Sequence, residues 1–256
     1  ARRANVICYS FWFEHVSFGL CLAKHSHQQL LVVSRAHGFD LYEERHHPPY
    51  WPCRKEALRL IDAVFSDSQC GTDYLRCRHP KFQSKYITAR LGVNDTGFLS
   101  RCSTDGVLRV VSCSPLYSVK RPDLMADSIE CLARLAPDNR VEWHHHGNGE
   151  LAASLIARMH GLPRNCVAQL HAYVSPAELY RFYHDAPIDV FLNLSSSEGT
   201  PVAIMEAIAC GIPVVATAVG GNCEIVTPEN GILVPANPTP ETVANELIRF
   251  RDPVAV

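Results

Sequence analysis

Short apolar runs alternate with longer amphipathic stretches along the whole chain. The apolar runs have the length of strands, and the stretches between them have the length of helices. The sequence predicts helices at residues 13–25 and 52–62. It predicts strands at residues 5–10, 30–34, 63–68, 86–93, 107–114, 141–147, 166–173, 188–196, 213–218 and 231–235.

Helix start signals mark the second part of the chain. Ser175 and Glu178 form a capping box with Pro176 at the first helical position, and Thr239 precedes Pro240 in a similar way. Strands separated by helices predict βαβ units and a mostly parallel sheet that is buried on both faces.

A polar, turn-rich segment at residues 94–106 interrupts this alternation, and we predict a domain boundary there. The expected fold is α/β, with two Rossmann-like, doubly wound domains at residues 1–100 and 101–256. Such domains bind ligands beyond the carboxyl ends of their strands. The expected ligand site is therefore a cleft between the two domains.

Composition excludes several classes of protein. Hydrophobic residues make up 47% of the chain and charged residues 20%, as in globular and not in disordered proteins. A net charge of −2 gives no reason to expect a nucleic-acid partner. No apolar run has the length of a membrane span. The 11 cysteines form no CxxC pair, so we expect reduced thiols in a cytoplasmic protein.

The 13 histidines raise the question of a metal site, above all at His144, His145 and His146. On a strand, alternation sends His144 and His146 to one face and His145 to the other. No further ligand stands at a spacing typical of zinc sites, so we predict no metal.

The stretch SSSEGTPVAIMEA, residues 195–207, places Glu198 in a turn and Glu206 in the helix that follows. A helix start offers unpaired backbone N–H groups and partial positive charge, which favour an anion. Gly199 allows a ligand to approach the main chain, and Thr200 is a candidate cap for the helix. The alternative is that both glutamates merely favour the start of a helix.

Three further loops follow predicted strands. Lys120 and Arg121 are two adjacent cations that suit a diphosphate, although an ordinary solvated basic pair is the alternative. Gly147 opens a tight turn that lacks the full spacing of a dinucleotide site, and a simple reversal into a helix explains it as well. His37 is the fourth candidate, but a lone histidine is usually structural.

Together these residues resemble the family 4 glycosyltransferases, a group of retaining sugar-nucleotide enzymes with the GT-B fold. The resemblance is strongest at residues 189–235, where the turn, helix, strand and double glycine fall in the family's order. It extends in order through VSCSPLYSVKR, WHHHGNGE and RAHGFDLYEER, and so covers nearly the whole chain.

The resemblance implies roles for the candidates. Glu198 and Glu206 occupy the family's Glu-x7-Glu motif, in which the first contacts the transferred sugar and the second the ribose of the nucleotide. Gly199 and Thr200 would offer backbone amides to the sugar and the diphosphate. Lys120 matches the lysine that neutralises the departing diphosphate.

Two further positions follow from the same resemblance. Gly147 matches the glycine that opens the turn beside the nucleotide, and His37 matches a first-domain histidine near the donor sugar.

The implied activity is transfer of a hexosyl group, with retention, from a UDP- or GDP-sugar to a glycan, lipid-linked or polysaccharide acceptor. No metal is needed under this hypothesis, because Lys120 and a helix N-terminus supply the positive charge. The expected place is the cytoplasm. A lipid acceptor would add peripheral contact with the inner face of the membrane, although no basic amphipathic helix supports such contact here.

The sequence also departs from the family. Pro115 stands where members usually have an arginine, five residues before the lysine. Arg121 stands where glycine often follows, and it is a candidate to restore the missing charge. The chain enters the family's first domain partway through and lacks its closing helix, so we expect a fragment whose activity on its own is open.

Two alternatives to transfer stay open. One is a non-catalytic fragment or subunit that binds a nucleotide sugar. The other is a GT-B sugar-nucleotide epimerase, against which the context of the glutamate pair argues.

Overall fold

The computed structural model describes residues 6–251, which divide into two compact units. Unit 1 runs to Leu91 and includes Glu198–Thr200, and unit 2 comprises the rest of the chain from Gly92 onward. The segment 89–106 contains no helix or strand. The division falls at the start of this irregular segment, whereas the sequence analysis places the boundary at residue 100, inside it.

Unit 1 alternates strands and helices. Its elements are β1 (Val6–Ser10), α1 (His15–Ala23), β2 (Leu30–Ala36), α2 (Gly38–Leu41), η1 (Glu43–Arg45), α3 (Arg54–Leu60), β3 (Ala63–Ser66), α4 (Gln69–Arg78), η2 (Pro80–Lys85) and β4 (Tyr86–Thr88). The four strands predicted here are present, although the last is shorter than expected. Helix α4 was not predicted, and the hydroxyl of Ser68 caps its start by accepting from Gly71 N.

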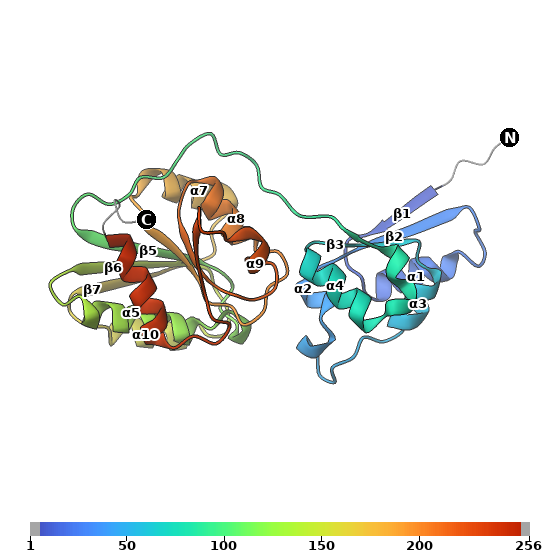
Figure 1. The fold of residues 1–256 in the computed structure, drawn as a ribbon, viewed down its shortest axis with the longest axis horizontal. Coiled ribbons are helices and arrows are strands. Elements are labelled where there is room, and N and C mark those ends of the chain that lie inside the picture. The colour runs from blue at the N-terminus through green and yellow to red at the C-terminus, as the bar shows by residue number, and fades with distance from the viewer. Residues whose placement is uncertain (1–5, 252–256) are drawn as a thin grey trace. The chain divides into compact units, whose positions relative to one another are not determined.

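The sheet of unit 1 is buried on one face only. Its parallel strands follow one another in the order β1-β2-β3-β4, and right-handed crossovers that all step in one direction place their helices on one face (Figure 1). The register aligns Ile7 with Leu31, and Phe65 with Ile87, on the opposite face. Ile7, Leu31 and Ile87 are exposed there. The prediction of sheets buried on both faces is therefore wrong for this sheet.

Unit 2 contains every strand predicted for the second part of the chain. Its elements are β5 (Val107–Cys113), η3 (Ser118–Lys120), α5 (Pro122–Leu135), β6 (Arg140–His146), α6 (Ala152–His160), β7 (Cys166–His171), α7 (Pro176–Asp185), β8 (Val190–Asn193), α8 (Val202–Ala209), β9 (Val214–Thr217), α9 (Asn222–Ile225), β10 (Gly231–Val234), α10 (Pro240–Leu247) and η4 (Ile248–Arg251).

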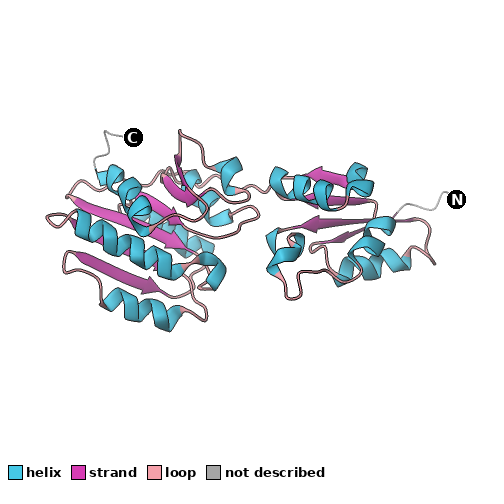
Figure 2. Ribbon diagram, turned by 60° about the horizontal axis from the view of Figure 1, so that its bottom comes forward, coloured by secondary structure: helices cyan, strands magenta, loops and turns pink. Residues whose placement is uncertain are grey.

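The sheet of unit 2 is doubly wound. Its six parallel strands lie in the order β10-β9-β8-β5-β6-β7, so the chain first moves outward from β5 through β6 and β7 and then returns to β8 on the other side. This reversal places helices on both faces (Figure 2). One core cluster packs α5, α6 and α10 against the sheet, and another packs α7 and α8. The prediction of a doubly wound α/β domain is confirmed for this unit.

The predicted capping box of α7 is confirmed. Ser175 Oγ accepts from Glu178 N at 3.3 Å, and the Glu178 carboxylate accepts from Ser175 N at 2.7 Å. Thr239 caps α10 by accepting from Thr242 N at 3.2 Å. The prediction that Thr200 caps α8 is wrong, because extended Pro201 is the N-cap residue and no side chain of the described residues caps this helix.

His145 belongs to a buried chain of hydrogen bonds. Its Nε2–H donates to the Ser114 carbonyl at 3.1 Å, and Ser112 Oγ–H donates to its Nδ1 at 2.8 Å. Trp143 Nε1–H in turn donates to Ser112 Oγ at 2.9 Å. Burial lowers the pKa of His145 to about 4, so the ring is neutral at physiological pH.

His144 and His146 lie on the opposite face of β6, as predicted. The rings of His146 and His171 stack with centroids 4.4 Å apart, and Phe182 of α7 packs against both. Within residues 6–251, no group of three metal-binding side chains is placed to hold an ion. The helices of the same range are all too short or too polar to cross a membrane.

The buried His145 should make the protein less stable in mild acid. An unfolded histidine takes up a proton below its ordinary pKa of 6.5, whereas folded His145 does so only near 4. The unfolded state therefore binds more protons between these values, and stability falls as pH is lowered. From pH 7 to pH 5 we expect His145 to contribute a loss of about 2 kcal/mol.

Urea unfolding at both pH values checks this expectation. Between pH 7 and pH 5, His145→Gln should lose about 2 kcal/mol less unfolding free energy than the native chain. The contributions of the other buried histidines to this loss should be unchanged. Equal losses in the two proteins would contradict the assignment.

Candidate functional site

The strand order of unit 2 creates a crevice at β5. Strands β5 and β8 are neighbours, with Val110 aligned to Val190, but the chain leaves them toward opposite edges of the sheet. The loops that follow two such strands diverge, and ligands of doubly wound folds bind between them. The loop after β5 carries Lys120 and Arg121, and the loop after β8 carries Glu198.

Arg121 joins three loops at this edge of the sheet. Its Nη2 donates to the Ser195 carbonyl at 3.1 Å and to the Ala236 carbonyl at 2.7 Å. Ser196 N also donates to the Val119 carbonyl at 2.8 Å. The loops after β5, β8 and β10 are thus fastened together, and the guanidinium predicted to face a diphosphate is engaged with main-chain oxygens.

The backbone at Arg121 has a conformation that favours glycine. Arg121 has φ of 49° and ψ of 54°, in the left-handed region. A residue with a Cβ atom is strained there by about 1 kcal/mol, whereas glycine is not. The two hydrogen bonds to carbonyls offset that strain in this chain.

Gly147 and Gly149 allow the loops after β5 and β6 to pack backbone against backbone. A Cβ atom on Gly147, which has φ of 145°, would lie 2.0 Å from the Ser114 carbonyl oxygen. A Cβ atom on Gly149 would lie 2.6 Å from the Leu116 carbonyl oxygen. Leu116 N donates to the Asn148 carbonyl at 3.0 Å across the same contact. Gly147 is therefore required by close packing and not only by the turn.

Glu206 and Lys120 both lie near the carboxyl end of β5. Burial raises the pKa of the Cys113 thiol, at the end of this strand, to about 11. The nearby Glu206 carboxylate adds to this rise, and the Lys120 ammonium opposes it. Burial also raises the pKa of Glu206 itself, against a hydrogen bond from the Tyr180 hydroxyl. One carboxylate and one ammonium thus both act electrostatically on the thiol at the end of this central strand.

The other candidates of this loop region are Glu198, Gly199 and Thr200. They lie between β8 and α8 and belong by contact to unit 1. Their order along the chain places an acidic side chain and a glycine directly before a helix start.

His37 lies in unit 1, at the residue before α2. Its ring packs against Phe11 and Trp12, with centroids 4.6 and 4.7 Å away. Both ring nitrogens are buried and lack a hydrogen-bond partner in the described part of the chain. Burial, aided by the charge of Arg35, lowers the pKa of His37 to about 4. The neutral ring is suited to hydrogen bonding and not to carrying a charge.

Two residues that were not sequence candidates form hydrogen bonds to the candidates His37 and Glu206. Asp40 is fully buried and accepts from His37 N at 2.6 Å and from Phe13 N. Tyr180 reaches Glu206 from another helix. The spacing His37-x-x-Asp40, which is typical of a helix cap, could have indicated the role of Asp40. Nothing in the sequence pairs Tyr180 with Glu206.

A family model described as "Glycosyl transferases group 1" matches residues 108–252, which is more than half of the chain. The chain belongs to this family. The match includes Lys120, Gly147, Glu198 and Glu206. No curated protein matches the sequence.

Solved structures show the same fold at low sequence identity. S. aureus TarM, in complex with fondaparinux, alpha-GlcNAc-glycerol and UDP, aligns with a TM-score of 0.68 at 17% identity, over 88% of this chain and 44% of TarM. The lipopolysaccharide outer core galactosyltransferase WaaB aligns with a TM-score of 0.75 at 14% identity, over 94% of this chain and 65% of WaaB. Anabaena HepE, in complex with UDP and glucose, aligns with a TM-score of 0.70 at 17% identity, over 94% of this chain and 67% of HepE.

These likenesses confirm the predicted α/β GT-B fold. The chain spans 44% of the length of TarM and 65% of that of WaaB.

Substitution of Gly147 by alanine should destabilise unit 2. The new methyl group would overlap the Ser114 carbonyl and would need a strained φ, so we expect a loss of about 3 kcal/mol or more in the free energy of unfolding. Gly161→Ala is the matched control in the same unit, because its Cβ atom would lie 3.5 Å from the Arg158 carbonyl oxygen, an ordinary contact. Urea unfolding compares the two, and equal stability would refute the requirement for glycine at residue 147.

Proposed function

We propose that this group 1 glycosyltransferase moves a hexosyl group, with retention, from a UDP- or GDP-sugar to a glycan, lipid-linked or polysaccharide acceptor. The observation that carries the proposal is the group 1 family match over residues 108–252, which includes Lys120 in the loop after β5 and Glu206 on α8. The TarM and HepE structures contain UDP, which supports a uridine nucleotide as the first donor to test.

Each group suits a different part of such a donor. A diphosphate needs a cation, and the Lys120 ammonium is the proposed partner. A ribose carries two adjacent hydroxyl donors, and an ionised carboxylate such as Glu206 accepts from both. The hydrogen bond from Tyr180 favours the ionised form of Glu206. Gly147 keeps the neighbouring loop close to the nucleotide.

The sugar would meet Glu198, Gly199 and Thr200, with the neutral His37 as a hydrogen-bond partner for a sugar hydroxyl. In the transfer, the bond between the anomeric carbon and the diphosphate oxygen breaks. The acceptor oxygen bonds to the same face of that carbon, and its proton passes to the leaving diphosphate. The N–H groups at the start of α8 and Lys120 would stabilise the charge that develops, without a metal ion.

A nucleotide-sugar binder without transfer activity is the second candidate. Pro115 replaces the family's arginine, and the guanidinium of Arg121 is engaged with two carbonyl oxygens. Fewer cations than usual then face the diphosphate, which favours binding over catalysis.

The two glutamates should separate binding from transfer. We expect Glu198→Gln to lower kcat at least about a hundredfold while UDP binds as before, because the change affects the reacting sugar. We expect Glu206→Gln to weaken UDP binding about tenfold, because a charged acceptor of the ribose is lost.

Calorimetry with UDP and product analysis with a panel of UDP- and GDP-sugars check both effects. Full transfer by Glu198→Gln would refute the site. Binding of a nucleotide sugar by the native chain without turnover would instead support the second candidate, and an isomerised donor would indicate an epimerase.

Lys120 and Arg121 should differ although they are adjacent and carry the same charge. Lys120→Met should weaken UDP binding about tenfold, since it removes the charge proposed to face the diphosphate. Arg121→Met should lower the free energy of unfolding by about 2 kcal/mol, since two loop carbonyls lose a charged donor. Calorimetry and urea unfolding of both variants check this, and native affinity in Lys120→Met would exclude its proposed role.

A further inference from the structure

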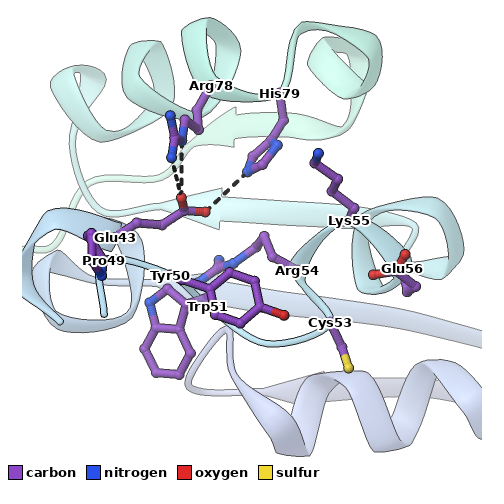
Figure 3. A pocket seen from close by; sticks show the side chains of 10 residues that line it. All are labelled: Glu43, Pro49, Tyr50, Trp51, Cys53, Arg54, Lys55, Glu56, Arg78 and His79. Carbon is purple, nitrogen blue, oxygen red and sulfur yellow. Dashed lines mark hydrogen bonds and ion pairs between the residues drawn. The ribbon is translucent and has the colours of Figure 1, made fainter. Parts of the chain in front are cut away.

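Unit 1 contains a pocket of about 430 Å³ that lies wholly within residues 43–79. The loop before α3, the first residues of α3 and the end of α4 form its walls (Figure 3). None of the residues discussed above as donor-site candidates lines it.

Two carboxylates line this pocket, and each is paired with an arginine. Glu56 Oε1 lies 3.5 Å from Arg59 Nη1 in an exposed pair, and Glu43 is paired with Arg78. The Glu43 carboxylate accepts from Arg78 Nη2 at 2.8 Å and Arg78 Nε at 3.0 Å. His79 Nε2 lies 3.6 Å from its other oxygen (Figure 3). Two side chains at the end of α4 thus occupy both carboxylate oxygens, and Glu43 has little capacity left to attract a cation.

Buried donors beside Glu43 have no acceptor. Arg54 is 5% exposed, and its Nη2 donates to the Asp40 carbonyl, but its Nη1 has no partner among residues 6–251. Trp51 Nε1 is likewise buried without a partner in that range. Buried N–H groups that lack an acceptor cost free energy, so this arrangement favours a ligand that supplies oxygen atoms.

The two donors are held in place by packing. The Arg54 guanidinium lies 4.2 Å from the centroid of Phe13 and 5.4 Å from that of Trp51. Trp51 also packs edge-to-face against His46, with centroids 4.5 Å apart. The guanidinium and the indole are therefore held in fixed orientations, which lowers the entropy that they lose when a ligand binds.

Lys55 adds a cation at the mouth. Its side chain extends toward the pocket on the side of His79 (Figure 3). Its ammonium forms no ion pair with any residue of the described part of the chain. Tyr50, which is 57% exposed, presents its ring beside Trp51. Three cations and two carboxylates line the pocket, and one cation, Arg78, is paired with Glu43. Besides that ion pair and Glu56, the site presents Arg54, Lys55, an indole N–H and an exposed aromatic face.

We propose that this pocket binds an oxyanion carried by a sugar ring, that is, a phosphorylated or carboxylated sugar. The oxyanion would accept from Arg54 Nη1, Trp51 Nε1 and Lys55 Nζ, and the ring would lie against Tyr50. The pocket is larger than a bare phosphate requires, which favours an oxyanion with an attached ring. This ligand is separate from the nucleotide-sugar donor, and the inference does not depend on the proposed function.

Calorimetric titration of the chain with glucose 6-phosphate, glucuronate and glucose tests the proposal. At least one of the two anions should bind, while neutral glucose should not. The ratio of the dissociation constants of the two anions distinguishes a phosphate from a carboxylate ligand. Lys55→Met should weaken binding about threefold to tenfold, because it removes one partly solvated charge. Trp51→Phe keeps the ring but removes the N–H, and should weaken binding about fivefold.

Lys81→Met is the matched control, since Lys81 is an exposed lysine of η2 outside the pocket. It should bind the anion as the native chain does, and all three variants should bind UDP unchanged. Three results would each overturn the proposal: no binding of either anion at millimolar concentration, equal weakening by Lys81→Met and Lys55→Met, or competition between the anion and UDP. Anion binding that follows the expected pattern in a chain that fails to bind UDP would refute only the proposed function.

Discussion

The reversal of strand order at β5 is the constraint on which the rest of unit 2 depends. Because the strands are parallel, the loops after β5, β6 and β8 all lie at one edge of the sheet. The loops pack there with main chain against main chain, and this requires glycine at residue 147 and favours it at residue 149.

Some polar groups near that edge already form hydrogen bonds within the protein, whereas others are proposed to bind a ligand. Arg121 is a cation by type, yet its guanidinium holds the Ser195 and Ala236 carbonyls. His145 is likewise committed to Ser112 and Ser114, and its burial keeps it neutral. Residue type alone is therefore weak evidence for ligand binding until the hydrogen-bond partners of the side chain are known. A donor that is already paired gains little free energy from a ligand.

Unit 1 shows the opposite case. Its pocket contains donors that were not candidates on sequence grounds, since Trp51, Arg54 and Lys55 stand in an ordinary loop and helix start. What sets Trp51 and Arg54 apart is that each has a buried N–H group without an acceptor in the described part of the chain. The ion pair between Glu43 and Arg78 removes the acceptor that might otherwise have served them.

The sequence by itself determined the order of strands and helices in unit 2, the caps at Ser175 and Thr239, and the positions of charged residues after strands. These follow from local periodicity and local hydrogen bonds, which depend on neighbours a few residues away. Only the tertiary structure decided that Thr200 does not cap α8, that the sheet of unit 1 has an open face, and that Tyr180 reaches Glu206. Each of these depends on the direction of a crossover or on contacts between distant elements, and a periodic pattern carries no information about either.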